Sequence, residues 1–328
     1  MTKNFCITGG AGFIGSHFAM MLSERKKTDS EIGEIIIYDK LTYAADINRL
    51  YGLNVLLVEG DICNSTLLKK TFKDHQITHI VHFAAESHVD RSITDELPFL
   101  QTNILGTACA IESAEQHFST LGEFVKETLF VHISTDEVYG EILESDPAAT
   151  EETALRPSNP YAATKGAADQ LVIAKMLRGV FPSIIVRSSN NFGVSQHPEK
   201  MIPKVIKCLK EGMPIPVYGQ GAQMRCWISA NTFSEIVMHL INTGIKGEIF
   251  NICGREVLSN LELVNKIRSH FAEKNDLALE TISQVQFVED RKYHDFFYHV
   301  DDSKLSRVLE GIHEIKYETL DAFFNKVL

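Results

Sequence analysis

The first half of the chain alternates short apolar runs with longer amphipathic stretches. The run Ile35-Ile36-Ile37 is entirely β-branched, which is typical of a strand buried on both faces. Between such runs, apolar residues recur with helical spacing. This alternation predicts an α/β fold, a doubly wound parallel sheet covered by helices on both faces. The expected strands are residues 4–8, 34–38, 55–58, 80–83, 129–133 and 183–186, and the expected helices are residues 14–24, 65–75, 100–116 and 161–178.

The pattern changes after residue 187, where four prolines and the turn glycines Gly219 and Gly221 interrupt it. Helical periodicity returns at residues 232–243 and 261–272. We therefore expect a sheet domain over residues 1–187 and a smaller mixed α/β region over residues 188–328, with an interleaved boundary. The polar, acidic segment 145–153 predicts an exposed loop.

Composition narrows the range of partners. The 328 residues are 44% hydrophobic and carry a formal net charge of -11. An acidic chain is a poor match for nucleic acid, which requires a basic face. No run of about 18 apolar residues occurs, so no membrane partner is expected. The six cysteines form no CxxC pair and show no metal-ligand spacing, which predicts free thiols, a cytoplasmic protein and no metal site.

Glycines follow the first expected strand and open the first expected helix. Gly9, Gly12 and Gly15 have the spacing GxxGxxG, with Phe13 and Ile14 between the last two. Glycine allows a tight turn and a close approach of the backbone to a pyrophosphate. The helix N-terminus then presents N–H groups and a positive dipole end to that anion. The context indicates a Rossmann-type dinucleotide site.

Asp39 ends the second expected strand, 24 residues after Gly15. A carboxylate there can accept hydrogen bonds from the ribose hydroxyls and would repel a 2′-phosphate, which favours NAD over NADP. Asp61 and Ile62 follow the third strand and are predicted to meet the adenine. Ala84 and Ala85 follow the fourth strand and are predicted to line the cofactor.

Tyr161 and Lys165 lie four residues apart at the start of an expected helix and therefore share one face. An ammonium beside a phenol favours the phenolate and lowers the tyrosine pKa. The pair is predicted to contact the cofactor and to take a proton from a sugar hydroxyl while hydride leaves for nicotinamide.

Upstream of this pair, residues 134–140 read STDEVYG. Here the chain resembles the extended short-chain dehydrogenase/reductase family, in its dTDP-glucose 4,6-dehydratase branch. The segments AAESHVDRS at 84–92, RSSNNFG at 187–193 and HPEKMIP at 197–203 match the same pattern, and the resemblance covers nearly the whole chain.

The resemblance implies a lyase that uses NAD to convert a nucleotide-linked glucose into a 4-keto-6-deoxy sugar. Glu137 would abstract the proton from sugar carbon 5, and Asp136, as a neutral acid, would protonate the departing carbon-6 hydroxyl. Thr135 would hold the carbon-4 hydroxyl near Tyr161. Two neighbouring acids in a secluded site resist double ionisation, which pushes their pKa values apart.

The same resemblance implies the substrate-binding residues. Asn190 would contact the phosphate or sugar, Lys200 would lie near the nucleotide pocket, and Arg225 and Arg291 would hold the diphosphate through their guanidinium forks. Ser87 and His294 complete this set. The chain departs from the family pattern at Cys226, Asn231, Arg255 and Phe297, which leaves UDP-glucose open beside dTDP-glucose.

Two alternatives use the same scaffold without dehydration. Epimerases and decarboxylases share the glycine motif and the Tyr–Lys pair but generally lack an Asp-Glu pair after Ser-Thr. A non-catalytic NAD-binding protein would need none of the catalytic residues. Asp136 and Glu137 therefore favour dehydration. By resemblance we also expect a homodimer, paired through the helices at residues 100–116 and 161–178.

Overall fold

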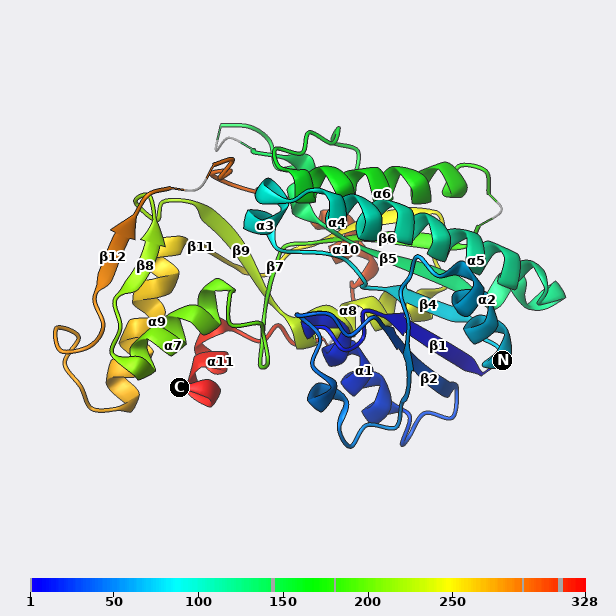
Figure 1. Ribbon diagram of the computed structural model, residues 1–328, viewed down its shortest axis with the longest axis horizontal. Coiled ribbons are helices and arrows are strands. Elements are labelled where there is room, and N and C mark those ends of the chain that lie inside the picture. Colours follow the sequence, from blue (N-terminus) through cyan, green and yellow to red (C-terminus); the bar gives the residue numbers. More distant parts are fainter. Residues whose placement is uncertain (1, 143–144, 180, 291, 312–314) are drawn as a thin grey trace.

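The computed structural model of the protein describes residues 2–142, 145–179, 181–290, 292–311 and 315–328. They form a large lobe built on a helix-covered sheet and a smaller lobe beside the carboxyl edge of that sheet (Figure 1). The N-terminus lies at the far end of the large lobe and the C-terminus on the small lobe.

The sheet of the large lobe is parallel throughout the described residues. Its strands are β1 (Lys3–Thr8), β2 (Ile32–Asp39), β3 (Leu56–Glu59), β4 (His79–His82), β5 (Leu129–Thr135), β6 (Ser183–Ser188) and β10 (Glu248–Ile252). They are ordered β10-β6-β5-β4-β1-β2-β3, so the direction of winding reverses between β1 and β4. Such a reversal leaves a crevice at the carboxyl ends of the strands, where doubly wound folds bind ligands.

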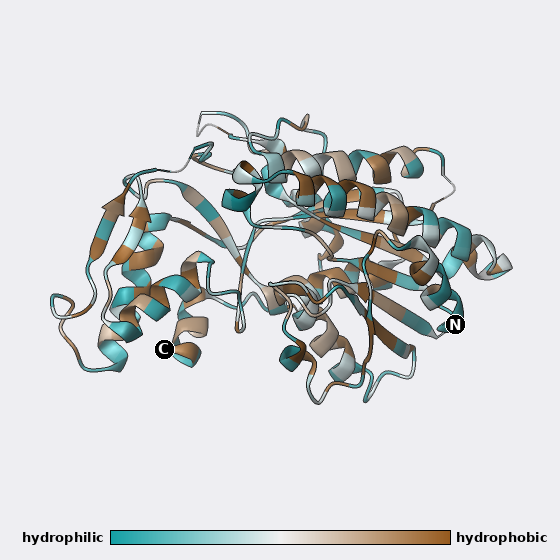
Figure 2. Cartoon of the chain, in the orientation of Figure 1, coloured by the Kyte–Doolittle hydropathy of each residue, from teal (hydrophilic) through white to brown (hydrophobic). Residues whose placement is uncertain are grey.

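Helices cover both faces of this sheet, as the sequence predicted. One layer contains α1 (Phe13–Arg25), α8 (Ala230–Thr243) and α10 (Ser303–Val308), and the other contains α2 (Ser65–Asp74), α5 (Thr107–Ser119) and α6 (Pro160–Met176). Ile35 and Ile37 pack into the first core and Ile36 into the second, all three at most 1% exposed. Figure 2 shows the resulting apolar strands between more polar helices.

Two predicted elements differ from expectation in detail. The strand expected at residues 55–58 forms β3, but it is an edge strand, and Leu56 and Leu57 are half exposed because only β2 pairs with it. The helix expected at residues 100–116 begins as a wider π-helical segment, η2 (Leu100–Gly106), before α5. The short helices α3 (Val89–Thr94) and α4 (Leu97–Phe99) precede it.

The small lobe contains two short sheets, β11-β9-β7 and β12-β8, packed against helices. Its elements are β7 (Asn190–Phe192), β8 (Ile215–Tyr218), β9 (Met224–Ser229), β11 (Glu256–Ser259), β12 (Val285–Val288), α7 (Met201–Glu211), α9 (Asn260–Lys274) and α11 (Leu320–Val327). The chain's second half also returns to the large lobe, where β10 pairs with β6 and α8 packs on α1.

Three short 3₁₀ segments complete the described chain: η1 (Ile47–Leu50), η3 (Gly122–Glu127) and η4 (Asp136–Tyr139). The predicted loop 145–153 is mostly exposed, but Ala149 is buried and bridges to Val300. Among the described helices, none combines the length and apolar character needed to cross a membrane.

Candidate active site

A cavity of about 350 Å³ lies at the carboxyl ends of β1, β2, β4 and β5. It extends from the glycine loop to the residues that follow β5 and to the first residues of the small lobe. The structure thus brings together most of the residues predicted from the sequence. Those lining it are Gly9, Gly12, Phe13, Ile14, Gly15, Asp39, Asp61, Ile62, Ala84, Ala85, Ser87, Thr135, Asp136, Glu137, Tyr161, Lys165, Asn190 and Lys200.

The glycine loop between β1 and α1 leaves no room for side chains. Gly9 has a φ of +69°, and a Cβ there would lie 2.6 Å from the backbone nitrogen of Ala84. A Cβ on Gly15 would lie 2.5 Å from the carbonyl oxygen of Gly9. Gly12 is the N-cap of α1 and lines the cavity. The first N–H groups of a helix have no carbonyl acceptor within the helix, so those of α1 are available to a ligand in the cavity. This backbone cradle fits a pyrophosphate.

Asp39 is held in place at the end of β2 by backbone donors. Its Oδ2 accepts a hydrogen bond from Ala11 N at 2.9 Å, and its Oδ1 accepts one from Leu41 N at 2.8 Å. Each carboxylate oxygen has a further lone pair for a ribose hydroxyl. Nearby, Lys40 forms a 2.7 Å ion pair with Asp61. Together with the cradle, these groups fit the phosphates and ribose of a dinucleotide such as NAD.

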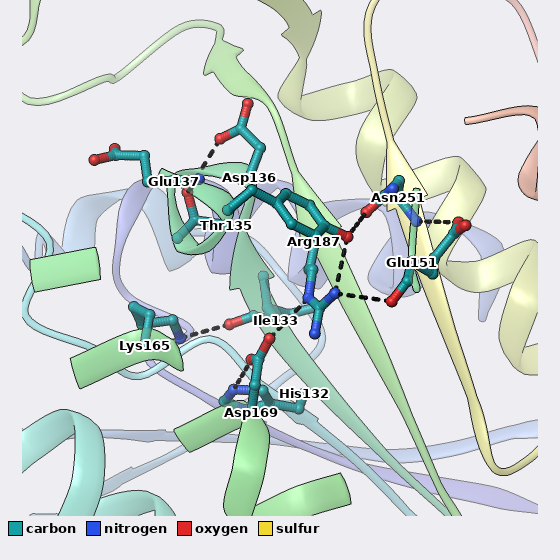
Figure 3. A network of polar contacts seen from close by, with 11 residues as sticks. His132, Ile133, Thr135, Asp136, Glu137, Glu151, Lys165, Asp169, Arg187 and Asn251 are labelled. Carbon is teal, nitrogen blue, oxygen red and sulfur yellow. Dashed lines mark hydrogen bonds and ion pairs between the residues drawn. The ribbon is translucent and has the colours of Figure 1, made fainter. Parts of the chain in front are cut away.

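The catalytic candidates come from three consecutive elements. Thr135 ends β5, and η4 follows at once with Asp136 and Glu137. Thr135 Oγ1 donates to Asp136 Oδ1 at 3.2 Å and accepts from Glu137 N at 3.3 Å. It also lies within hydrogen-bonding reach of the Tyr161 phenol on α6. Figure 3 shows Thr135, Asp136 and Glu137 fanning out from the end of the strand, with Lys165 below them.

The two acids differ in environment. Asp136 is 3% exposed, and burial raises its pKa well above the ordinary value, with the Glu137 charge as the second cause. Glu137 is only partly buried and accepts a hydrogen bond from Asn159 Nδ2 at 3.3 Å. Burial therefore favours the neutral form of Asp136 beside Glu137, which is the direction expected from the sequence for this acid.

The Tyr161–Lys165 pair behaves differently from the sequence prediction. Burial, followed by the Glu137 charge, raises the pKa of the Tyr161 phenol instead of lowering it. Lys165 Nζ donates to the carbonyl oxygen of Ile133 at 2.7 Å, and burial lowers the Lys165 pKa to about 8 against the opposing charge of Asp169. The predicted decrease is therefore wrong for the protein alone, because burial and the carboxyls of Glu137, Asp136 and Asp169 raise the pKa of the phenol.

A buried polar network lies behind this pair and was missed by sequence reasoning. Asp169 pairs with Arg187, with 2.8 Å between Oδ2 and Nε, and with His132, with 3.3 Å between Oδ1 and Nε2 (Figure 3). Burial raises the pKa of Asp169, but His132 and the Arg187 charge outweigh it and hold that pKa below its ordinary value. The available signal was the i, i+4 spacing of Lys165 and Asp169.

Only some of the predicted substrate-binding residues line the cavity. Lys200 Nζ donates to the carbonyl oxygen of Ser87 at 3.1 Å, so the small lobe touches the large lobe at the cavity. Arg225 lies outside the lining, because its guanidinium is buried over the Tyr298 ring and donates to three backbone carbonyls. His294 also lies outside and pairs with Asp290 at 2.7 Å. Arg291 lies outside the described residues.

Comparison with known proteins places the chain. A family model described as GDP-mannose 4,6 dehydratase matches residues 6–320. The chain is 40% identical to a dTDP-glucose 4,6-dehydratase of Salmonella typhimurium, with 92% of this chain and 86% of that protein covered. It is 41% identical to the low-salt glycan biosynthesis protein Agl12 of Haloferax volcanii, with 91% and 90% covered.

A crystal structure of the dTDP-glucose 4,6-dehydratase DesIV from Streptomyces venezuelae, with NAD bound, superposes with a TM-score of 0.83 at 33% identity. It covers 98% of this chain and 95% of that one. The chain belongs to the extended short-chain dehydrogenase/reductase family, in its 4,6-dehydratase branch.

The positions at which this dehydratase-family chain departs from the pattern are all outside the cavity lining, among the described residues. Each makes contacts within the protein instead. Cys226 Sγ donates to Gly254 O, and Asn231 Oδ1 lies 2.7 Å from His17 Nδ1. Arg255 forms an ion pair with Asp302 and lies over the Tyr317 ring. The Phe297 ring stacks on the His299 ring. Among the described residues, no hydrogen bond or ion pair joins any of these four side chains to the predicted catalytic residues.

Proposed function

We propose that the protein catalyses the NAD-dependent 4,6-dehydration of dTDP-glucose to the 4-keto-6-deoxy sugar nucleotide. The observation that carries this proposal is the adjacent pair of acids in one cavity, where burial raises the pKa of Asp136 next to Glu137. The curated relatives support dTDP-glucose as the substrate. NAD, when bound, supplies a positively charged ring and a site that takes up and gives back hydride.

In the proposed reaction, different side chains carry out the proton transfers. Thr135 holds the carbon-4 hydroxyl, and Tyr161 takes its proton as hydride leaves carbon 4. The resulting ketone acidifies the hydrogen on carbon 5, which Glu137 removes. Asp136 gives its proton to the carbon-6 hydroxyl, and water departs. Hydride is then added at carbon 6, and Glu137 returns its proton to carbon 5, so the sugar gains no net oxidation.

A substrate assay tests the proposed function. The purified protein is incubated separately with dTDP-glucose and UDP-glucose, and the products are analysed by mass spectrometry and by absorbance in alkali. We expect dTDP-glucose to lose one water and to form a keto sugar. A product of unchanged mass would indicate an epimerase, and a loss of water only from UDP-glucose would move the assignment to that substrate.

The proposal extends to assembly and location. Leu97, Leu100 and Leu105 are 73%, 42% and 53% exposed along α4 and η2, beside α5 and α6. Exposed leucines on neighbouring helical turns are typical of a helix-to-helix interface. They support a homodimer in which a second copy covers these helices. The six free thiols support a reducing compartment such as the cytoplasm.

A further inference from the structure

The dehydration leaves two side chains in the wrong protonation state for the next turnover. Tyr161 has gained the proton of the carbon-4 hydroxyl, and Asp136 has lost its proton to the departing water. Glu137 is unchanged, because the proton it removes returns to carbon 5. One proton must therefore pass from Tyr161 to Asp136, or be exchanged with solvent at both residues, before the site can react again.

Thr135 lies between these two residues. Its Oγ1 donates to Asp136 Oδ1 at 3.2 Å, accepts from Glu137 N at 3.3 Å, and is within hydrogen-bonding reach of the Tyr161 phenol. A hydroxyl has one donor and two acceptor positions. Because Glu137 N uses one acceptor and Asp136 the donor, the remaining acceptor is available to the phenol.

We infer that the Thr135 hydroxyl carries a proton from Tyr161 to Asp136 after each turnover, an inference that rests on the proposed dehydration. The Tyr161 O–H bond breaks as its proton passes to Thr135 Oγ1, and the original Thr135 proton passes to Asp136 Oδ1. Thr135 ends unchanged, Tyr161 ends as the phenolate and Asp136 as the neutral acid. The proton taken from the carbon-4 hydroxyl then reaches the acid that releases water in the next cycle.

Burial makes this internal route favourable over exchange with solvent. Thr135 is 7% exposed and Asp136 is 3% exposed, so bulk water reaches neither side chain easily. Burial also raises the pKa of Asp136, which favours the protonated acid that the relay restores there. Both residues are fixed by the same turn, since Thr135 caps η4 through Glu137 N.

The test compares the first turnover with the steady state in Thr135→Val and Thr135→Ser variants. Valine keeps the shape and removes the hydroxyl, while serine keeps the hydroxyl. The enzyme equilibrates with solvent before mixing, so the first turnover of Thr135→Val needs no relay and should slow roughly tenfold for one lost hydrogen bond. Its steady-state rate should fall roughly 100-fold further, and Thr135→Ser should restore both rates.

Small buffer acids provide the second measurement. Formate or imidazole should raise the steady-state rate of Thr135→Val by carrying protons from solvent, and should leave the wild-type rate unchanged. The wild-type arm needs no variant, so it holds even if Thr135→Val fails to fold. Equal losses in the first turnover and the steady state, or a wild-type rate that rises with buffer concentration, would overturn the relay. Dehydration by the wild type would still stand, whereas a wild type that removes no water would overturn the proposed function itself.

Discussion

At the scale of single residues, burial shifts the pKa values of side chains in this site, so residue type alone does not determine their chemistry. Asp136 and Glu137 are adjacent in sequence, yet the first is almost completely buried and the second is partly exposed. Their chemical identity and spacing could be read from the sequence, as could the Tyr161–Lys165 pair. The direction of the Tyr161 pKa shift could not be read from the sequence, because it depends on how deeply folding buries the phenol beside three acids.

A pH profile tests the state of Lys165. Burial lowers its pKa to about 8, so the ammonium is present below that pH and is lost as pH rises through it. We expect kcat/KM to fall by roughly tenfold per pH unit above this point if the ammonium is required. Replacing Asp169 removes the opposing negative charge, so the fall should move to lower pH.

The variant must keep the buried charges balanced. Asp169→Asn alone would leave the buried Arg187 without its partner, so it is paired with Arg187→Gln. Folding is checked by the fluorescence of Trp227, the one tryptophan of the chain. A profile that stays flat to pH 9, or a fall that does not move in the double variant, would contradict the assigned role of the Lys165 charge.

At the scale of elements, the glycine loop shows what sequence reasoning can and cannot provide. The GxxGxxG spacing after an apolar run predicted the strand, the turn and α1 in their observed order. The short strands β7 to β12, including β10 of the large sheet, were not predicted, because each is only three to six residues long and finds its partner through contacts distant in sequence. The same lack of local signal hid the buried contacts of Arg225 with the carbonyl oxygens of Asp295 and Phe296.

Gly9→Ala tests the cradle against a matched glycine. Gly9 and Gly52 both have positive φ, +69° and +78°, but a Cβ on Gly52 would meet nothing within 4 Å. Both alanine variants should pay about 1–2 kcal/mol for the left-handed backbone. Gly9→Ala should cost more, because its Cβ would strike the Ala84 backbone, and it should also lose NAD.

Urea unfolding and the NAD retained after gel filtration measure these two effects. Gly52→Ala should retain NAD at the wild-type level. Equal losses of stability in the two variants, with NAD retained in both, would show that the close approach of Gly9 to Ala84 is unimportant.

At the scale of the whole molecule, segments of both lobes meet around one cavity. Tyr43 lies under the Arg91 guanidinium and against the His197 ring, and Glu199 pairs with both His88 and His197. Arg49 Nη2 also donates to Ser195 O at 2.8 Å. The sequence predicted a second, substrate-binding region, but contacts between residues more than 100 positions apart could not be read from a local pattern.

The proposed dimer is tested at the same scale. Leu97→Glu combined with Leu105→Glu places charges on the exposed leucines of α4 and η2, and we expect the protein to sediment as a monomer. Leu279→Glu, at an exposed leucine of the small lobe, is the control and should not change the sedimentation. A double variant with wild-type mass in solution would place any interface elsewhere.

The proposed reaction moves one hydride from carbon 4 to carbon 6 of the same sugar, and one isotope measurement tests this transfer most directly. The protein is given dTDP-glucose that carries deuterium at carbon 4, and the keto sugar is examined by NMR. The account predicts that the product retains the deuterium, now on carbon 6. A dehydrated product without deuterium on carbon 6 would contradict it.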